Sequence, residues 1–247
     1  MKVAAWQAPL LPGNSTAAAL RLVREQIDRC EAEGVEILCC PEGILGGLAD
    51  YAPRPTEIAI DAAGGHLETV LAPLASGTVT TIVGFTEIDR GRLYNAAAVY
   101  HRRTVAGLYR KQHPAINRSV YAAGDDAPVF TIGGLTFGII ICLDSTFAEP
   151  ARTMALQGAT ALFVPTNNGL PPGRAGPGLV DETRQRDIRL AAANRTWVIR
   201  ADVTGSAGDL RSEGSSGMVS PDGVVLQTAR PFCTGMLMTD IDQYPGK

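Results

Sequence analysis

Three side chains of the 247-residue sequence lie where apolar segments end, and their types together suit nucleophilic catalysis. Cys142 ends the apolar segment LTFGIIIC, Glu42 follows VEILCCP, and Lys111 follows RTVAGLYR. A thiol supplies a soft nucleophile, a carboxylate whose pKa is raised by burial supplies a general base, and a fixed cation stabilises an oxyanion. Together they indicate attack of a thiol on an electrophilic carbon.

Each of these residues also has a purely structural interpretation when it is taken alone. Cys142 can be a packed thiol at a strand end, because free cysteine is commonly buried. Glu42 can be a solvated loop carboxylate, Lys111 can be a surface lysine, and His113 is an alternative base for a Cys–His pair. The segment that follows Cys142 favours a functional site, because it contains unusually many polar residues for the end of a core strand. They are Asp144, Ser145, Glu149 and Arg152.

Apolar strands and helices alternate along the chain, as in an α/β layer. The first half is predicted to hold a strand at 2–9, a helix from Asn14 or Ser15 to Gly34, a strand at 35–43 and a helix near 66–75. Four strands follow in a pattern that resembles an antiparallel meander, at 78–88, 93–101, 103–111 and 128–134. The later elements are a strand at 159–167, a helix at 179–194, a strand at 196–203 and a hairpin around Asp222-Gly223.

Cys142 itself is predicted to lie where a strand at 135–142 runs into a helix at 144–159. Amides at a helix N-terminus favour the thiolate form and can donate hydrogen bonds to an oxyanion. The start of this helix therefore favours an activated thiol, and a packed apolar cysteine is the alternative.

Composition excludes several classes of function. The formal net charge of −3 argues against a nucleic-acid partner and against binding to acidic membranes. No apolar run approaches the roughly 20 residues of a membrane span, and the N-terminus does not read as a signal peptide. Five cysteines without CxxC spacing indicate a reduced, cytoplasmic setting, and three histidines in no metal-binding pattern predict that there is no metal site.

Three motifs, in this chain order, resemble those of the nitrilase superfamily of carbon–nitrogen hydrolases. They are the glutamate of CCPEG, the lysine of LYRKQHP and the cysteine of GIIICLD. The resemblance extends over nearly the whole chain, through KVAAWQAP, ALQGATALFVPTN, RQRDIRLAAANRTWVIRADVTG and SEGSSGMVSPDGVVLQTA. It implies a single carbon–nitrogen hydrolase domain over 1–247, with an α/β fold built as a four-layer αββα sandwich of two mixed sheets.

The resemblance also implies a catalytic triad of Glu42, Lys111 and Cys142 that needs no cofactor. Glu42 takes the thiol proton and later activates water. Lys111 and the backbone amide of Leu143 hold the oxyanion, and His113 becomes structural. The family commonly forms homodimers or larger homo-oligomers, which we expect here by analogy.

Substrate contacts are predicted less directly. Asn117 occupies the place where many family members have a second glutamate, and it cannot exchange protons. Leu143 stands where an aromatic residue is common. In the proline- and glycine-rich loop at 166–178, Asn167 and Asn168 can bind a carbonyl or an amide, and Arg174 can bind a carboxylate, although each can also be an ordinary polar loop residue.

The favoured function is hydrolysis of a small amide or N-carbamoyl compound, with release of ammonia or an amine. Nitrile hydrolysis uses the same nucleophile and stays open. A catalytically impaired binding or regulatory protein is a further alternative, supported by Asn117. Acyl transfer to an amine would use the same thioester, but the chain lacks the membrane spans expected of lipoprotein acyltransferases.

Overall fold

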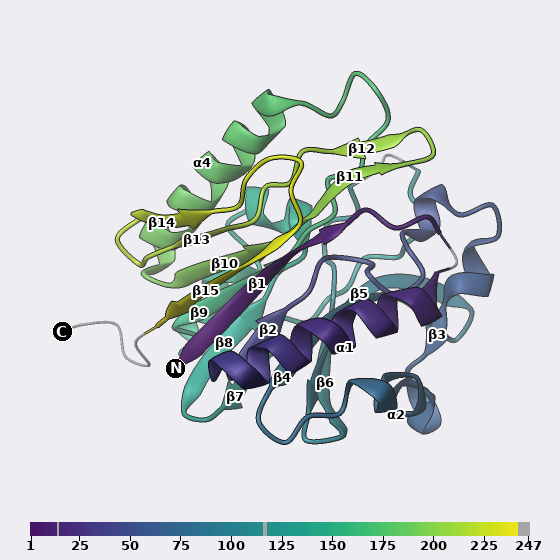
Figure 1. Ribbon diagram of the computed structural model, residues 1–247, viewed down its shortest axis with the longest axis horizontal. Coiled ribbons are helices and arrows are strands. Elements are labelled where there is room, and N and C mark those ends of the chain that lie inside the picture. Colours follow the sequence, from purple (N-terminus) through teal and green to yellow (C-terminus); the bar gives the residue numbers. More distant parts are fainter. Residues whose placement is uncertain (14, 116–117, 242–247) are drawn as a thin grey trace.

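Two β-sheets lie face to face in the computed structural model, which describes residues 1–13, 15–115 and 118–241 (Figure 1). The first sheet has the strand order β12-β11-β1-β2-β4-β5-β6, and β15 and β3 pair with β1 and β4. Its strands are β1 (Lys2–Pro9), β2 (Ile37–Cys39), β3 (Ile60–Asp61), β4 (Thr80–Asp89), β5 (Arg92–His101), β6 (Thr104–Arg110), β11 (Val203–Ala207), β12 (Leu210–Ser212) and β15 (Gly235–Asp240).

The second sheet has the order β14-β13-β10-β9-β8-β7. Its strands are β7 (Val129–Ile132), β8 (Leu135–Ile139), β9 (Ala161–Pro165), β10 (Trp197–Ala201), β13 (Gly217–Val219) and β14 (Val225–Thr228). β8, β9 and β10 are parallel, as expected where helices connect neighbouring strands.

The side chains of β1 show how the two hydrophobic cores arise. Val3 and Ala5 pack in the core between the sheets, whereas Ala4 and Trp6 pack in the core on the opposite face of the first sheet. Successive side chains of a strand point to opposite faces, so a strand that is apolar throughout must be covered on both sides. This explains why β1 shows no polar alternation.

Helices provide that outer cover. α1 (Thr16–Glu33) and α2 (His66–Leu71) pack on the first sheet through buried residues such as Val23 and Leu71. α3 (Ala151–Leu156) contacts β8, and α4 (Pro177–Asn194) contacts β10 and β13 of the second sheet. α1 and α4 accordingly lie on opposite sides of the paired sheets (Figure 1). The αββα fold class is confirmed.

Two local predictions were wrong, and one strand was missed. The meander ends after β6, because β7 pairs with β8 in the other sheet. The helix expected at 144–159 is instead a 3₁₀ turn at Cys142–Thr146 followed by α3, since a proline inside a helix breaks it and Pro150 directly precedes α3. β15, which pairs antiparallel with β1, was not predicted.

The strand directions bring the carboxyl ends of several strands to one edge of the sandwich. β1, β2 and β4 are parallel, and β6 runs in the same direction because two antiparallel pairings separate it from β4. Glu42, Lys111 and Cys142 all follow such carboxyl ends, at β2, β6 and β8. Within the described part of the chain, no helix is both long and apolar enough to cross a membrane.

Candidate active site

Glu42 sits in the short loop after β2, held against the neighbouring strand β4. A Cβ atom at Gly84 of β4 would lie 2.5 Å from the carbonyl oxygen of Pro41 and 2.9 Å from the Cα atom of Glu42. Only glycine lets the two backbones approach this closely. The glycine of the GFTE segment is therefore a condition for placing the Glu42 carboxylate.

The carboxylate of Glu42 is almost fully buried and is bound by three donors. Its Oε1 atom accepts hydrogen bonds from Lys111 Nζ at 2.6 Å and from Asn95 Nδ2 at 2.7 Å. Its Oε2 atom accepts a bond from the backbone N–H of Asn167 at 2.9 Å. These contacts join β5, the end of β6 and the loop after β9, so the carboxylate has little freedom to move.

Lys111 forms a buried ion pair with Glu42, in which the two side chains are 3% and 2% exposed. Burial alone would lower the pKa of the ammonium group. The charge of Glu42, with smaller effects from Cys142 and Asp144, outweighs burial and leaves the pKa of Lys111 raised. Lys111 is therefore a fixed cation at neutral pH.

Cys142 is half-buried and has a φ of 47°, in the left-handed region that non-glycine residues seldom adopt. Such a turn directs the side chain of a strand-end residue away from the sheet, the geometry that nucleophile elbows also use. Burial, followed by the charge of Glu42, raises the pKa of Cys142 to about 12, and Lys111 offsets part of this rise. The thiol is thus neutral at rest, contrary to the expectation of a helix-activated thiolate.

Asp144 fixes the turn that carries the cysteine. Its carboxylate is fully buried and accepts hydrogen bonds from the backbone N–H of Ile141 at 3.0 Å and from Tyr109 Oη at 2.7 Å. It also accepts a bond from the backbone N–H of His113 at 2.9 Å, and the His113 ring lies 3.0 Å away. His113 therefore supports the turn, and its ring stacks on Phe147.

A second buried charge lies beneath the same turn. The guanidinium of Arg200 binds Asp187 of α4, Thr166 Oγ1 at 2.6 Å and Ser145 Oγ at 3.0 Å, and Ser145 Oγ in turn donates to the carbonyl oxygen of Cys142. These bonds connect the cysteine turn, the end of β9 and α4. Removing one partner of such a buried network costs about 3–5 kcal/mol.

One cavity of about 320 Å³ contains most of the residues predicted for the site. Glu42, Lys111 and Cys142 line it together, and the predicted contacts that also line it are Leu143, Asn167, Asn168 and Arg174. The predicted contact Asn117 lies outside the described residues. Tyr51 also lines the cavity, whereas Phe147 is 42% exposed and stacks on His113.

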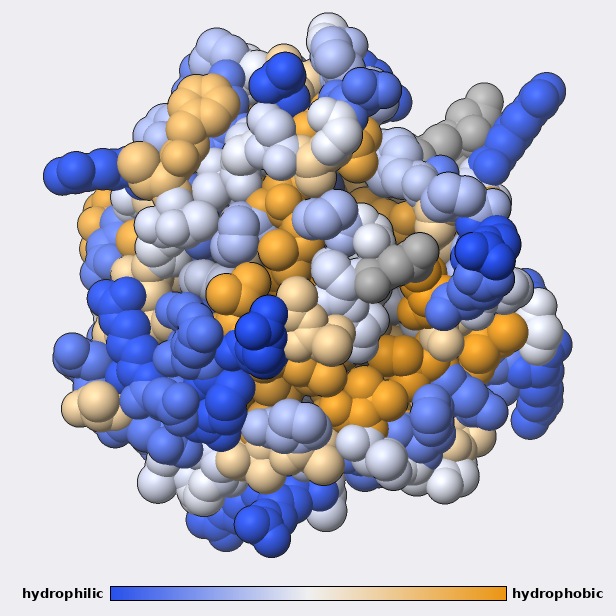
Figure 2. Space-filling model, turned by 45° about the vertical axis from the view of Figure 1, so that its right-hand side comes forward, coloured by the Kyte–Doolittle hydropathy of each residue, from blue (hydrophilic) through white to orange (hydrophobic). Residues whose placement is uncertain are grey.

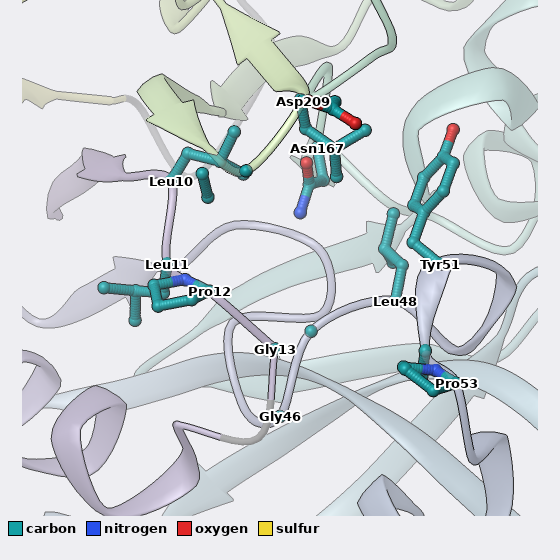
Figure 3. A pocket seen from close by; sticks show the side chains of 15 residues that line it. Leu10, Leu11, Pro12, Gly13, Gly46, Leu48, Tyr51, Pro53, Asn167 and Asp209 are labelled. Atoms are coloured by element: carbon teal, nitrogen blue, oxygen red, sulfur yellow. The ribbon is translucent and has the colours of Figure 1, made fainter.

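A larger cavity of about 530 Å³ adjoins this one and shares Leu48, Tyr51 and Asn167 with it. Figure 3 shows its two sides, with Leu10 and Pro12 opposite Leu48 and Tyr51. Apart from Asp209, its lining residues carry no ionisable acid, base or thiol suited to catalysis at neutral pH. In the view of Figure 2, apolar side chains gather across the middle of the face that is drawn, with hydrophilic ones at the margins. The chemistry of the smaller cavity, rather than size, identifies the candidate active site.

Sequence reasoning missed several residues that hold the site. Asn95 binds the glutamate, and Asp202 binds Asn168. Both are polar residues at buried positions in otherwise apolar segments, LYNAAAVYH and WVIRADV, and buried polar groups require a partner. That requirement was the available signal. No group of three or more residues suited to hold a metal ion occurs in the part of the chain that the structure describes.

Comparison with known proteins gives consistent matches. The model of the carbon-nitrogen hydrolase family matches residues 2–244. The chain is 30% identical over 240 residues to a nitrilase of Pyrococcus abyssi, covering 95% of this chain and 86% of that one. It is 29% identical over 232 residues to an (R)-stereoselective amidase of a Pseudomonas species, with coverages of 92% and 81%.

Among solved structures, an amidase from Nesterenkonia has a similar fold, with a TM-score of 0.82 at 21% identity. The match covers 98% of this chain and 90% of that chain.

Proposed function

The chain belongs to the carbon–nitrogen hydrolase family, and from this we propose that it hydrolyses small amides or N-carbamoyl compounds through a thioester on Cys142. The observation that carries the proposal is the Glu42–Lys111 ion pair in the cavity that Cys142 also lines. This arrangement supplies the base, the cation and the nucleophile that acyl transfer requires.

The reaction begins with transfer of the thiol proton to Glu42 as Sγ attacks the substrate carbon. The new C–S bond leaves a negative charge on the substrate oxygen, which Lys111 Nζ and the backbone N–H of Leu143 hold. Glu42 then returns the proton to the nitrogen, the C–N bond breaks, and ammonia or an amine leaves. Water attacks the thioester, Glu42 takes its proton, and the carboxylic or carbamic acid departs as the thiol is regenerated.

The state of the thiol supports a base-assisted mechanism. A thiol whose pKa is about 12 is almost entirely neutral at pH 7, so it needs a base at the moment of attack. The buried Glu42 carboxylate, which forms an ion pair with Lys111, is that base. When the thiol proton moves to Glu42, the carboxyl group becomes neutral and the charge that develops at Cys142 is paired with Lys111. A buried site favours this, because no charge is left without a partner.

One residue of the cavity wall, Arg174, indicates which chemical group the preferred substrates carry. The guanidinium of Arg174 forms no ion pair among the described residues, whereas Arg186 pairs with Glu182 at 3.2 Å. An unpaired guanidinium suits a carboxylate in bidentate geometry. We propose that substrates with a carboxylate remote from the scissile bond are preferred over neutral amides of the same length.

The test is to follow ammonia release from a panel of amides, N-carbamoyl compounds and nitriles, with Cys142→Ala as the control. Turnover that survives Cys142→Ala would refute the mechanism. Labelling of Cys142 by iodoacetamide without turnover of any panel member would favour a binding protein instead. Turnover restricted to nitriles would favour nitrile hydrolysis, the activity named for the Pyrococcus abyssi relative.

A further inference from the structure

The side-chain amide of Asn168 is held in one orientation beside the candidate nucleophile. Its Oδ1 atom lies 3.9 Å from Cys142 Sγ. Its Nδ2 atom donates to Asp202 Oδ2 at 3.0 Å and to Ser215 Oγ at 3.1 Å. Because a side-chain amide has only two N–H bonds, both donors are used, and Asn168 presents an acceptor to the thiol.

Asp202 prevents this amide from turning round. The carboxylate is fully buried in the stretch between β10 and β11. Its Oδ1 atom accepts bonds from the backbone N–H groups of Asn168 at 3.0 Å and Val203 at 2.8 Å. Its Oδ2 atom accepts bonds from Asn168 Nδ2 and from the N–H and Oγ of Ser215 at 2.9 and 2.6 Å.

Burial raises the pKa of Asp202, and hydrogen bonds from Ser215, Asn168 and Val203 act against this rise. All five groups bound to the carboxylate oxygens are placed as donors, so the carboxylate serves only as an acceptor. If the Asn168 amide turned by half a revolution, its Oδ1 atom would face the Asp202 carboxylate. The carboxylate would then lose the hydrogen bond that Nδ2 donates to it. Leaving a buried charged acceptor unpaired costs more than losing an ordinary hydrogen bond. The acceptor therefore stays directed at the thiol.

Besides the Glu42 carboxylate, which is assigned to the thiol proton, two polar groups of the cavity have the opposite character. The Lys111 ammonium can only donate, and so can the backbone N–H of Leu143. Donors suit the oxygen of the reacting group, whereas an acceptor suits an N–H. The cavity thus offers separate partners for the oxygen and for the nitrogen of an amide.

We propose that Asp202 positions Asn168 so that its Oδ1 atom accepts a hydrogen bond from the N–H of the scissile amide, which makes the site selective for substrates that carry this N–H. The inference rests on the proposed function. Esters and nitriles have no N–H at this place, so they leave Oδ1 facing a lone pair. A site built to bind a substrate N–H discriminates against analogues that lack it.

The experiment compares a primary amide with the methyl ester of the same acid, by the kcat/KM of each. Asn168→Ala is expected to lower kcat/KM for the amide about tenfold more than for the ester, the loss that corresponds to one hydrogen bond. Asp202→Asn is expected to lower the amide-to-ester ratio in the same direction, because the amide of Asn168 can then turn. Ser215→Ala, which removes one partner of each residue, is a milder variant should Asp202→Asn not fold.

Thr204→Val is the matched control. Thr204 is as buried as its neighbours, and its hydroxyl donates to the carbonyl oxygen of Glu213 at 3.0 Å without contacting Asn168. The amide-to-ester ratio should stay at the wild-type value in this variant, even though a buried hydrogen bond is lost.

Equal losses on amide and ester in Asn168→Ala would overturn the inference and leave the proposed function intact. An unchanged ratio in both Asp202→Asn and Ser215→Ala, in folded protein, would overturn the positioning role of Asp202. If the wild-type protein hydrolyses neither compound nor any other member of the panel, the proposed function fails and the inference fails with it.

Discussion

Glu42→Gln tests the candidate site most directly, because it preserves the shape of the side chain and removes only its charge and one acceptor atom. In the wild-type protein the carboxylate receives Lys111 and Asn95 on one oxygen and the backbone N–H of Asn167 on the other. Glutamine has one acceptor oxygen, so one of these donors must face an NH₂ group. Lys111, which is 3% exposed, also loses its counter-charge.

Two separate losses are expected from this substitution. Breaking a buried ion pair by removal of one partner costs about 3–5 kcal/mol, and two of the three donors can keep the glutamine oxygen, so we take the lower end, about 3 kcal/mol. For a chain of this size that corresponds to a fall in Tm of about 6–12 °C. Loss of the general base should lower kcat by about 10²–10⁴.

The assay combines ammonia release at a temperature well below the Tm with urea unfolding. Glu87→Gln is the matched control, because Glu87 is also 2% exposed and binds Arg110 Nε and Nη2, each at 2.7 Å. Arg110 immediately precedes Lys111, but it is 28% exposed and also pairs with Asp89 at 3.0 Å, so its charge stays partly paired and partly solvated when Glu87 is replaced. Glu87→Gln should lose stability and keep its kcat within about threefold of wild type.

Two results would refute the reasoning. A folded Glu42→Gln protein with more than about a tenth of the wild-type kcat would show that the carboxylate is not the base. Parallel losses of kcat in Glu42→Gln and Glu87→Gln, each in proportion to lost stability, would show that the effect of Glu42 is structural.

The remaining predictions concern the other members of the site. Cys142→Ala should abolish ammonia release with a change of at most about 1 kcal/mol in the free energy of unfolding by urea, because the side chain is only half-buried. Lys111→Met should lower kcat by at least about 10², the loss typical of one oxyanion partner, and stopped-time ammonia assays will measure it. Since burial and Glu42 raise the pKa of Cys142 to about 12, its alkylation by iodoacetamide should accelerate steadily through pH 10 by mass spectrometry. A plateau near pH 8.5, about the pKa of an ordinary thiol, would contradict this. Gly84→Ala should lower activity and Tm together, because the added methyl group meets the backbone of Glu42.

The sequence by itself determined the elements and the chemistry available to them. Apolar runs such as β1 and β9 predicted buried strands, and the order of Glu42, Lys111 and Cys142 indicated the family that the comparison confirms. These features are local, because the periodicity of apolar residues, the ends of strands and the residues of each motif can all be recognised within a short stretch of sequence. The roles of the three residues remain predictions.

Tertiary structure decided how those groups behave. The sequence favoured a thiol activated by a helix, but the helix begins only after Pro150, and burial, followed by the charge of Glu42, raises the pKa of the thiol. Asn95 and Asp202 are polar residues in otherwise apolar segments, and only the pairing of distant segments shows that they hold Glu42 and Asn168. A pKa and a hydrogen-bond orientation depend on groups remote in sequence that share a low-dielectric interior, and no local pattern specifies those neighbours.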